Sequence, residues 1–301
     1  MRKVTVTVPC SSANLGAGFD VLALALSLRN TVEFFETRQG VEIDVEGEGH
    51  QDIPTDTTNL VYRSAEAVFD HVGRRPTGLR IHAVNAVPPG SGMGSSAAAI
   101  VGGVVAANAL IDARLSRETL VRIAHGIEGH PDNVAAQILG GLTLVSAAEE
   151  ELLVRRLDVP PLTVTVALPD FKLSTAEARR ILPQEVPLKD AIFNIGHAVF
   201  TVQALAAGDY ELLRFAMNDR LHQPYRKRLI PGFDLVCAAA RQAGAAALAI
   251  SGAGPSIIAF APRGHDAIAN AMRRAFTESG LNSRTFVLPV DRQGVQVSVI
   301  G

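Results

Sequence analysis

The sequence predicts an α+β fold in which helices pack on layers of antiparallel strands. The expected helices and strands alternate irregularly, and short turns of the hairpin type join neighbouring strands, which favours such layers over a doubly wound parallel sheet. The chain has 301 residues, of which 48% are hydrophobic and 19% are charged. This composition is sufficient for a large core, and the length allows one large domain or two of ordinary size.

The composition also limits the partners that we expect. The formal net charge is −2 and there are no long runs of like charge, so neither nucleic acid nor an anionic membrane is an expected partner. No uninterrupted apolar run is long enough to span a bilayer. Cys10 and Cys237 lie far apart without metal-ligand spacing, which suits a reducing compartment. These features predict a soluble cytoplasmic protein.

Hydrophobic periodicity and capping residues predict the elements of the first half of the chain. Helices are expected at 60–71 behind Asn59, at 96–110, and at 117–128 behind the cap Ser116. Strands are expected at 4–8, where Pro9 ends the run, at 31–37 and 41–45, which are read as a pair, and at 79–87.

The run Asp158-Val159-Pro160-Pro161 is the best candidate for a domain boundary, and we divide the chain into residues 1–155 and 156–301. In the second part, strands are expected at 162–168, 246–250, 257–261, 284–290 and 295–300. Helices are expected at 174–182, 189–207, 209–220, 233–243 and 264–279.

The stretch with the clearest chemistry is Pro88-Pro89-Gly90-Ser91-Gly92-Met93-Gly94-Ser95-Ser96, between an expected strand and an expected helix. The first turn of a helix carries unpaired N–H groups and partial positive charge, and glycines let the backbone approach a ligand closely. The pattern indicates a cradle for a polyphosphate, although a glycine-rich turn that only caps a helix is the alternative. No lysine lies near it, which excludes a Walker A loop, and Ser95 stands where a dinucleotide fingerprint has glycine.

Several acids and amides are candidates for chemistry near this loop. Glu128 ends a helix four residues before Asp132, and an acid beside a triphosphate is a natural Mg²⁺ ligand. Asn14 and Asp20 lie in a second glycine-containing segment. Each has a structural alternative as well, because Asn14 suits a tight turn, Asp20 a helix cap, and Glu128 an exposed helix end.

Two basic segments follow in the second half. Ser174 and Glu177 form a capping box, which leaves Arg179 and Arg180 free, and Arg226 lies in a basic segment between prolines. A guanidinium can hold a carboxylate with two hydrogen bonds, although an exposed loop is the alternative for 224–231. The glycines of 251–256 suit either a hairpin turn or backbone contact with a polar ligand.

Together these segments resemble the GHMP small-molecule kinases. The segment 89–97 is similar to their phosphate-binding motif, with Met93 in place of the usual leucine. The segments 9–20 and 251–255 resemble their N-terminal and C-terminal motifs, with Cys10 where alanine is commoner. Within the superfamily, the segments 128–135, 174–179 and 224–233 resemble the homoserine kinases. The likeness covers nearly the whole chain in the same order.

The resemblance implies an N-terminal domain like the second domain of ribosomal protein S5 and a ferredoxin-like C-terminal α/β domain. It also implies phosphorylation of the side-chain hydroxyl of L-homoserine, as in threonine biosynthesis, with ATP and Mg²⁺ as cofactors. A different GHMP kinase, or a non-catalytic nucleotide-binding regulator on the same fold, stays open as an alternative, and so does assembly as a homodimer.

The resemblance assigns roles to individual residues. Asn59 and Leu60 correspond to positions near the adenine, residues 89–96 to the triphosphate loop, and Ser96, or its neighbour Ser95, with Glu128 to the Mg²⁺ ligands. Asp132 corresponds to a base used by related kinases, and Asn133 is the alternative group that orients the hydroxyl. The amino-acid substrate is expected to contact the following residues: Asn14, Asp20, His130, Asp132, Arg179, Arg226 and Gly254.

Overall fold

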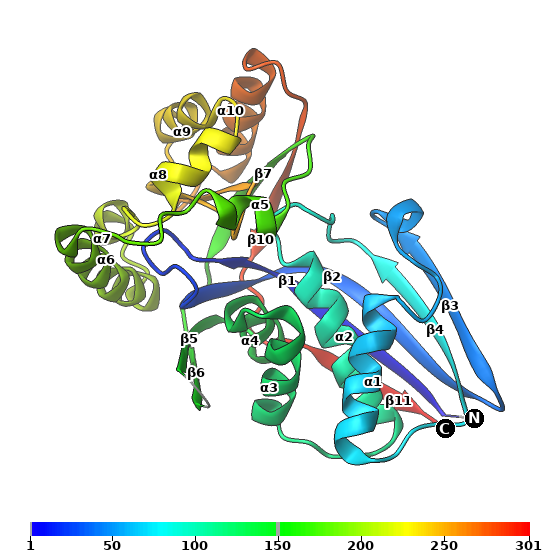
Figure 1. The fold of residues 1–301 in the computed structure, drawn as a ribbon. Coiled ribbons are helices and arrows are strands. Elements are labelled where there is room, and N and C mark those ends of the chain that lie inside the picture. The colour runs from blue at the N-terminus through cyan, green and yellow to red at the C-terminus, as the bar shows by residue number, and fades with distance from the viewer. Residues whose placement is uncertain (1, 149–150) are drawn as a thin grey trace.

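The computed structural model describes residues 2–148 and 151–301, and it confirms the α+β prediction (Figure 1). Its strands form two sheets. The larger sheet has the order β11-β1-β2-β4-β3, with β5 paired to β2 and β6 paired to β5. The smaller sheet has the order β10-β7-β9-β8.

The strands of the described chain are β1 (Lys3–Ala13), β2 (Leu22–Thr37), β3 (Gly40–Gly47), β4 (Gly78–Asn85), β5 (Leu142–Ala148), β6 (Glu151–Leu157), β7 (Thr163–Pro169), β8 (Ala247–Ile250), β9 (Ile257–Phe260), β10 (Ser283–Pro289) and β11 (Gln296–Ile300). The α-helices are α1 (Leu60–Val72), α2 (Ser95–Leu110), α3 (Arg117–Glu128), α4 (Pro131–Leu139), α5 (Thr175–Arg180), α6 (Leu188–Ala207), α7 (Tyr210–Ala216), α8 (Gln223–Arg226), α9 (Phe233–Gln242) and α10 (His265–Glu278). Short 3-10 turns occur at His50–Asp52 and Lys227–Leu229.

Helices α1 to α4 lie together against the larger sheet (Figure 1). Alternate residues of β1, such as Val4 and Val6, are fully buried against them, as the period of two requires. Helix α2 carries no charged residue and lies at the centre of this core. A Cβ on its Gly103 would lie 2.2 Å from the carbonyl oxygen of Val61 in α1, so glycine permits the close approach of these two helices.

Helices α9 and α10 cover the smaller sheet, and the chain then returns to the larger one. Strand β11 pairs with β1 in antiparallel register, from Lys3 opposite Ile300 to Thr7 opposite Gln296. Arg29 of β2 also forms an ion pair with Asp291. The larger sheet therefore extends through β6 to Leu157 and also includes residues 296–300. The domain boundary between residues 155 and 156 remains a prediction.

Two expectations about the strands are wrong, and the structure also rules out the helix that Asp20 would cap in its structural alternative. Strand β1 does not end at Pro9: it continues to Ala13, because a register shift between Pro9 and Cys10 accommodates a residue without an N–H group. The strands β2 and β3 do not pair, since β4 lies between them and is parallel to β3. The segment after Asp20 begins β2 rather than a helix.

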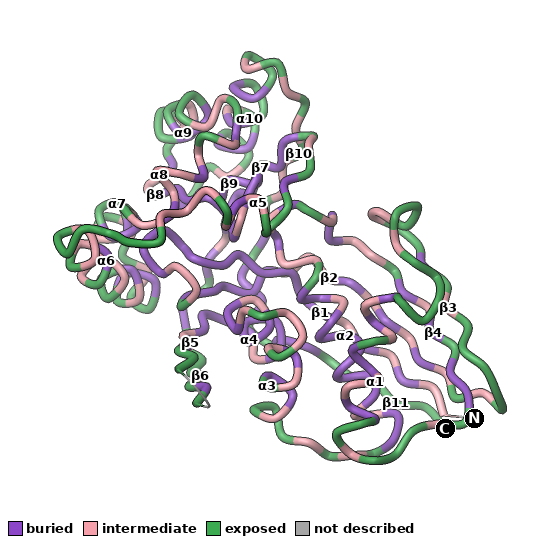
Figure 2. The backbone as a smooth tube through the Cα atoms, viewed as in Figure 1, coloured by how far each residue is buried: buried purple, intermediate pink, exposed green. Residues whose placement is uncertain are grey.

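Among the helices, α7 ends at Ala216, earlier than the predicted residue 220, because Asp219 turns the chain into α8. The helix α4 and the strands β5 and β6 were not among the predicted elements. In the described part of the chain, no helix combines the length and the apolar character needed to cross a membrane. Figure 2 shows that buried residues gather along β1, β2 and α2, whereas the outer strands β3 and β11 consist mostly of exposed residues.

Candidate active site

The glycine-rich loop lies between β4 and the N-terminus of α2. Gly90, Gly92 and Gly94 all have positive φ, at 66°, 77° and 71°, which explains the alternating glycines. A Cβ on Gly92 would lie 2.3 Å from the carbonyl oxygen of Ser251, so this loop packs directly on the loop between β8 and β9. The Ser251 hydroxyl donates to the Gly92 carbonyl at 2.7 Å, which fixes that contact.

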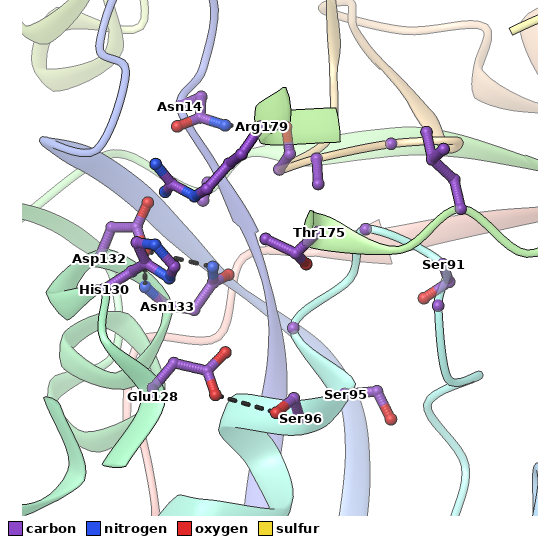
Figure 3. A pocket seen from close by; sticks show the side chains of 18 of the residues that line it. Asn14, Ser91, Ser95, Ser96, Glu128, His130, Asp132, Asn133, Thr175 and Arg179 are labelled. Atoms are coloured by element: carbon purple, nitrogen blue, oxygen red, sulfur yellow. Dashed lines mark hydrogen bonds between the residues drawn. The ribbon is translucent and has the colours of Figure 1, made fainter. Parts of the chain in front are cut away.

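The serines of this loop have different environments. Ser91 is buried and its hydroxyl donates to the carbonyl of Pro88 at 2.6 Å, while the Ser95 hydroxyl donates to the carbonyl of Val87 at 3.2 Å. The Ser96 hydroxyl instead donates to Oε2 of Glu128 at 2.9 Å (Figure 3). The side chain of Met93 is fully buried in the core and does not line the cavity.

Glu128 is the last residue of α3, and Gly129 terminates the helix in the left-handed conformation. Partial burial raises the pKa of the Glu128 carboxyl, and the hydrogen bond from Ser96 opposes this shift. No basic side chain of residues 2–148 and 151–301 lies within 4.0 Å of this carboxylate. It is therefore an acceptor without a cationic partner beside the glycine-rich loop.

Helix α4 begins with Pro131 after the cap position His130, and this turn presents Asp132 and Asn133 to the cavity (Figure 3). The Asn133 N–H donates to Oδ1 of Asp132 at 2.7 Å. Burial and the nearby Asp20 raise the pKa of Asp132 to about 7, whereas the Asn133 N–H and Arg179 lower it. For His130, whose charged form is the cation, burial instead lowers the pKa.

A hydrogen-bonded chain connects Asn133 to the glycine-rich loop. The Ser11 hydroxyl donates to Oδ1 of Asn133 at 2.8 Å, and Gln137 donates to the Ser11 hydroxyl at 3.0 Å. The same Gln137 amide donates to the carbonyl of Gly94 at 2.8 Å. The orientation of the Asn133 amide is thus set by residues from β1 and α4.

The other end of the cavity is formed by the segment after β1. Asn14 and Asp20 both have positive φ, and the Asp20 N–H donates to Oδ1 of Asn14 at 3.0 Å. The Asn14 amide donates to the carbonyl of Gly252 at 2.8 Å. Arg179 of α5 binds Asp20 with two hydrogen bonds of 3.0 and 2.7 Å. The neighbouring Arg180 is exposed and does not line the cavity.

Arg226 is the most unusual group at this end, because only 1% of the residue is exposed. Its Nε donates to the carbonyl of Ala178 at 3.1 Å and Nη1 to that of Gly252 at 3.2 Å. Burial lowers the pKa of Arg226 to about 10, and the residue stays protonated at neutral pH. No carboxylate of the described residues lies within 4.0 Å of its guanidinium.

His222 packs beside Arg226 and accepts a hydrogen bond from it. Its Nε2 donates to the carbonyl of Gly16 at 2.8 Å, which leaves Nδ1 as an acceptor 3.4 Å from Nη1 of Arg226. Burial lowers the pKa of His222, so the ring is neutral. Its ring stacks on Phe19 at 5.0 Å between centroids, and both Arg179 and Arg226 lie over the face of Phe19.

One cavity brings most of the predicted residues together. Its lining includes Asn14, Asp20, Gly90, Ser91, Gly92, Gly94, Ser95, Ser96, Glu128, His130, Asp132, Asn133, Arg179, Arg226 and Gly254. Asn59, Leu60 and Pro89 line an adjoining, mainly apolar pocket, which shares Gly90, Ser95 and Ser96 with the first. The Asn59 side chain caps α1 by accepting from the Val61 N–H at 2.9 Å.

Sequence reasoning missed several residues of this site. Leu173 and Thr175 line the cavity, and Ser11, Gln137 and His222 hold the lining residues in place. Thr175 directly follows the predicted capping serine, which was a usable signal. Gln137 lies on a helix that was not predicted, and nothing near it in the sequence marks its position.

Comparison with known protein families identifies the class of this protein. A model described as the GHMP kinases N terminal domain matches residues 59–141, and one described as GHMP kinases C terminal matches residues 201–278. The fold and the site therefore define a kinase of the GHMP type. A mevalonate kinase from L. major has the same fold, with a TM-score of 0.74 at 18% identity over 95% of each chain.

Closer relatives narrow the family. The chain is 46% identical to a homoserine kinase of Moorella thermoacetica, covering 92% of this chain and 93% of that protein. It is 42% identical to a homoserine kinase of Carboxydothermus hydrogenoformans, and the match covers 97% of this chain and 95% of that protein. The crystal structure of a homoserine kinase from Cytophaga hutchinsonii matches with a TM-score of 0.90 at 34% identity, and the match covers 98% of this chain and 97% of that chain. The chain belongs to the homoserine kinase family.

Proposed function

We propose that this protein transfers the γ-phosphoryl group of ATP to the side-chain hydroxyl of L-homoserine, which yields O-phospho-L-homoserine and ADP. The observation that carries the proposal is a single cavity that has the glycine-rich loop at one end and both acidic and basic side chains at the other. The chain is 42–46% identical in sequence to proteins named homoserine kinase, which supports L-homoserine as the substrate. The expected setting is the cytoplasm.

ATP would lie across the two adjoining pockets. The apolar pocket beside Asn59 and Leu60 suits a planar base, and it opens onto Gly90, Ser95 and Ser96 of the other cavity. Unpaired N–H groups at the start of α2 then face the phosphates. Ser91, whose hydroxyl is used within the loop, would contribute through its backbone.

Mg²⁺ fits the oxygen pair beside this loop. The Ser96 hydroxyl and the Glu128 carboxylate lie within hydrogen-bond distance, and oxygen ligands of this kind suit Mg²⁺. Since Glu128 has no cationic partner, we assign the metal to Glu128 and Ser96, and not to Ser95, which bonds to the backbone. When bound, the ion would neutralise charge on the transferring phosphoryl group.

The charged residues at the other end suit a zwitterionic amino acid. The buried Arg226 lacks a carboxylate partner, so it would bind the substrate carboxylate, with Arg179 closing over it from the opposite side. Asp20 would receive the ammonium group, aided by Asn14 and His130, while the buried Asp132 would face the side-chain hydroxyl. Mevalonate lacks an ammonium group, so Asp20 would lose its cationic partner when Arg179 moved to the substrate carboxylate, which makes mevalonate a poor substrate.

The transfer itself needs positioning and a route for one proton. The homoserine oxygen forms a bond to the γ-phosphorus while the bond to the β–γ bridging oxygen breaks, and the hydroxyl proton leaves. Asp132, with its pKa of about 7, is suited to accept that proton. Asn133, which Ser11 and Gln137 hold in place, would orient the hydroxyl.

A panel of small alcohols tests this function. We expect ATP- and Mg²⁺-dependent phosphorylation of L-homoserine, with much lower turnover of mevalonate, galactose and L-threonine. Mass spectrometry of the product identifies the phosphorylated hydroxyl. Faster turnover of mevalonate or galactose would indicate another GHMP kinase, and ATP binding without any phosphorylated product would indicate a nucleotide-binding regulator.

A further inference from the structure

The face of the larger sheet that is directed away from helices α1 to α4 carries a row of polar side chains. The row is in register across four neighbouring strands and consists of Thr5 of β1, Glu33 of β2, His82 of β4 and Asp44 of β3. The next residues on β3 and β4, Val45 and Ala83, belong to the hydrophobic core. Because side chains alternate between the two faces of a strand, the row lies on the solvent side of the sheet.

Glu46 adds a second carboxylate from β3 to this row, since it follows Asp44 by two residues. Nε2 of His82 lies 3.3 Å from Oε1 of Glu46 and 3.8 Å from Oδ2 of Asp44. One donor atom from each of these three residues lies within 4.8 Å of the other two. Of the basic side chains in the described part of the chain, only His82 lies within 4.0 Å of either carboxylate.

Glu33 lies on the other side of the imidazole. Its Oε2 is 3.7 Å from Nδ1 of His82, while its Oε1 binds Nζ of Lys3 at 2.7 Å and accepts from the Thr5 hydroxyl at 3.2 Å. A carboxylate beside one ring nitrogen favours the proton on that nitrogen and leaves the lone pair on the other. In His82 the lone pair is then on Nε2, which faces Asp44 and Glu46. Histidines that bind metal ions commonly have a carboxylate behind them in this way.

We propose that Nε2 of His82 and the carboxylates of Asp44 and Glu46 bind one divalent transition-metal ion of the Zn²⁺ type. Imidazole nitrogen and carboxylate oxygen both bind Zn²⁺ at about 2.0–2.2 Å, and three protein ligands with water in the fourth position form a tetrahedral site. At these bond lengths the donors lie about 3.3 Å apart, so the widest pair here has to approach by at most about 1.5 Å. Asp44 and Glu46 are well exposed, so rotation of their side chains can supply this movement.

The donor set favours Zn²⁺ over the Mg²⁺ that a kinase reaction uses. Mg²⁺ and Ca²⁺ prefer oxygen ligands and take six or more of them, whereas this cluster has an imidazole nitrogen at its centre. Imidazole suits the later first-row ions, among which Zn²⁺ ranks high in affinity. The site should therefore bind Zn²⁺ in the presence of excess Mg²⁺.

A cation at this site would lie behind one wall of the apolar pocket that we assign to the base of ATP. Val45, between the two proposed carboxylate ligands, and Ala83, next to His82, both line that pocket from the opposite face of the sheet. Strand β3 is at the edge of the sheet and pairs only with β4 in the described chain (Figure 1). An ion bound by side chains of both strands would hold β3 to β4 and stabilise this wall.

Zinc titration of the full chain tests the proposal. The protein is freed of any affinity tag, treated with EDTA and kept in excess Mg²⁺ without ATP or homoserine. Isothermal titration calorimetry should show one Zn²⁺ per chain, and Zn²⁺ should raise the melting temperature because it binds the folded state. Co²⁺ in place of Zn²⁺ should give the visible absorption bands of a nitrogen- and oxygen-ligated ion.

Substitutions then identify the ligands. Glu33→Gln should weaken Zn²⁺ binding about tenfold, because loss of a partner behind a metal ligand typically costs 10–100-fold in affinity. His82→Ala removes a ligand itself, so it should weaken binding at least about 100-fold and remove the rise in melting temperature. His82→Gln, which keeps a polar side chain on the strand, should do the same. The melting temperature without metal shows that each variant is folded.

Two matched controls separate this site from others. His71→Ala removes another exposed histidine, at the end of α1, and should bind Zn²⁺ like the wild type. Glu128→Gln should also bind Zn²⁺ normally, since that residue belongs to the proposed Mg²⁺ site. A wild-type chain that binds no Zn²⁺, displacement of Zn²⁺ by Mg²⁺, an equal loss in His71→Ala, or unchanged binding by both His82 variants would overturn the proposal. None of these measurements depends on turnover of homoserine.

Discussion

Arg179 binds Asp20 through two parallel hydrogen bonds, from Nη1 to Oδ2 at 3.0 Å and from Nη2 to Oδ1 at 2.7 Å. Both side chains are about one-third exposed, at 31% and 33%, whereas Arg226 is almost fully buried and has no such partner. The two arginines proposed to bind one carboxylate therefore begin from different states. Arg226 can bind the substrate carboxylate directly. Arg179 must either release Asp20 or keep it as a shared partner when it binds that carboxylate.

Arg226→Ala and Arg179→Ala should each raise the KM for homoserine strongly and leave ATP affinity nearly unchanged. Loss of one guanidinium from a charge-assisted pair costs roughly 2–5 kcal/mol, and the effect should be larger at the buried Arg226. Steady-state kinetics with each substrate varied measures this. Arg180→Ala is the matched control, because Arg180 is exposed on the same helix, and equal effects at 179 and 180 would refute the assignment.

Glu128→Gln should lower kcat far more than it changes homoserine binding. The substitution keeps the side-chain shape but removes the negative charge beside Ser96, and the loss of one such group typically costs on the order of 3 kcal/mol of transition-state stabilisation. Turnover at saturating Mg²⁺ is the measurement. Glu118→Gln, at an exposed position of the same helix, should have no effect. Turnover of the Glu128 variant within a few-fold of the wild type would exclude Glu128 as a ligand.

Asp132→Asn should stabilise the free protein at alkaline pH. A buried carboxyl whose pKa is raised to about 7 binds its proton more tightly in the folded state than in the unfolded state, where its pKa is near 4. Its contribution to stability therefore falls as pH rises from about 4 to about 7 and is constant above that. The variant should be more stable than the wild type by on the order of 4 kcal/mol at pH 8 and nearly equal near pH 4. Urea unfolding across this range would show no such divergence if Asp132 were ionised throughout.

Gly92→Ala should destabilise the protein and abolish ATP binding together. The residue has a φ of 77°, and its new Cβ would lie 2.3 Å from the Ser251 carbonyl oxygen, so the glycine-rich loop would have to separate from the β8–β9 loop. Thermal unfolding and nucleotide titration measure the two losses. Gly126→Ala is the control: Gly126 lies in helix α3, no atom of the described residues lies within 4 Å of a Cβ built there, and the substitution should stabilise the protein by about 0.5–1 kcal/mol. An unchanged melting temperature for Gly92→Ala would contradict the tight loop contact.

Most helices were predictable because their signals are local. The helix from Arg117 to Glu128 has the predicted bounds and the predicted cap at Ser116, whose hydroxyl accepts from the Thr119 N–H at 3.1 Å. Strand pairing was less predictable, because it depends on partners far away in the sequence. The neighbours β2 and β3 look like a hairpin, yet β4 intervenes, and only the complete sheet determines that order.

The site was predictable to the extent that its residues occur in motifs. Asn14, Ser96 and Arg226 line one cavity although more than two hundred residues separate the first from the last, and their segments suggested a shared role. Hydrogen bonding could not be predicted in the same way. The sequence alone did not indicate that Arg179 is paired with Asp20, or that the hydroxyls of Ser91 and Ser95 are directed to backbone carbonyls.

The pairing of β11 with β1 has a consequence for biosynthesis. A ribosome delivers the first eleven-residue strand early, whereas its neighbour on one side, residues 296–300, is made some 280 residues later. During translation the N–H and C=O groups along that side of β1 have no native partner and can pair with another nascent chain. Slowed synthesis of the last part of the gene should therefore increase aggregation during expression, and a chaperone that shields Lys3–Thr7 should reduce it.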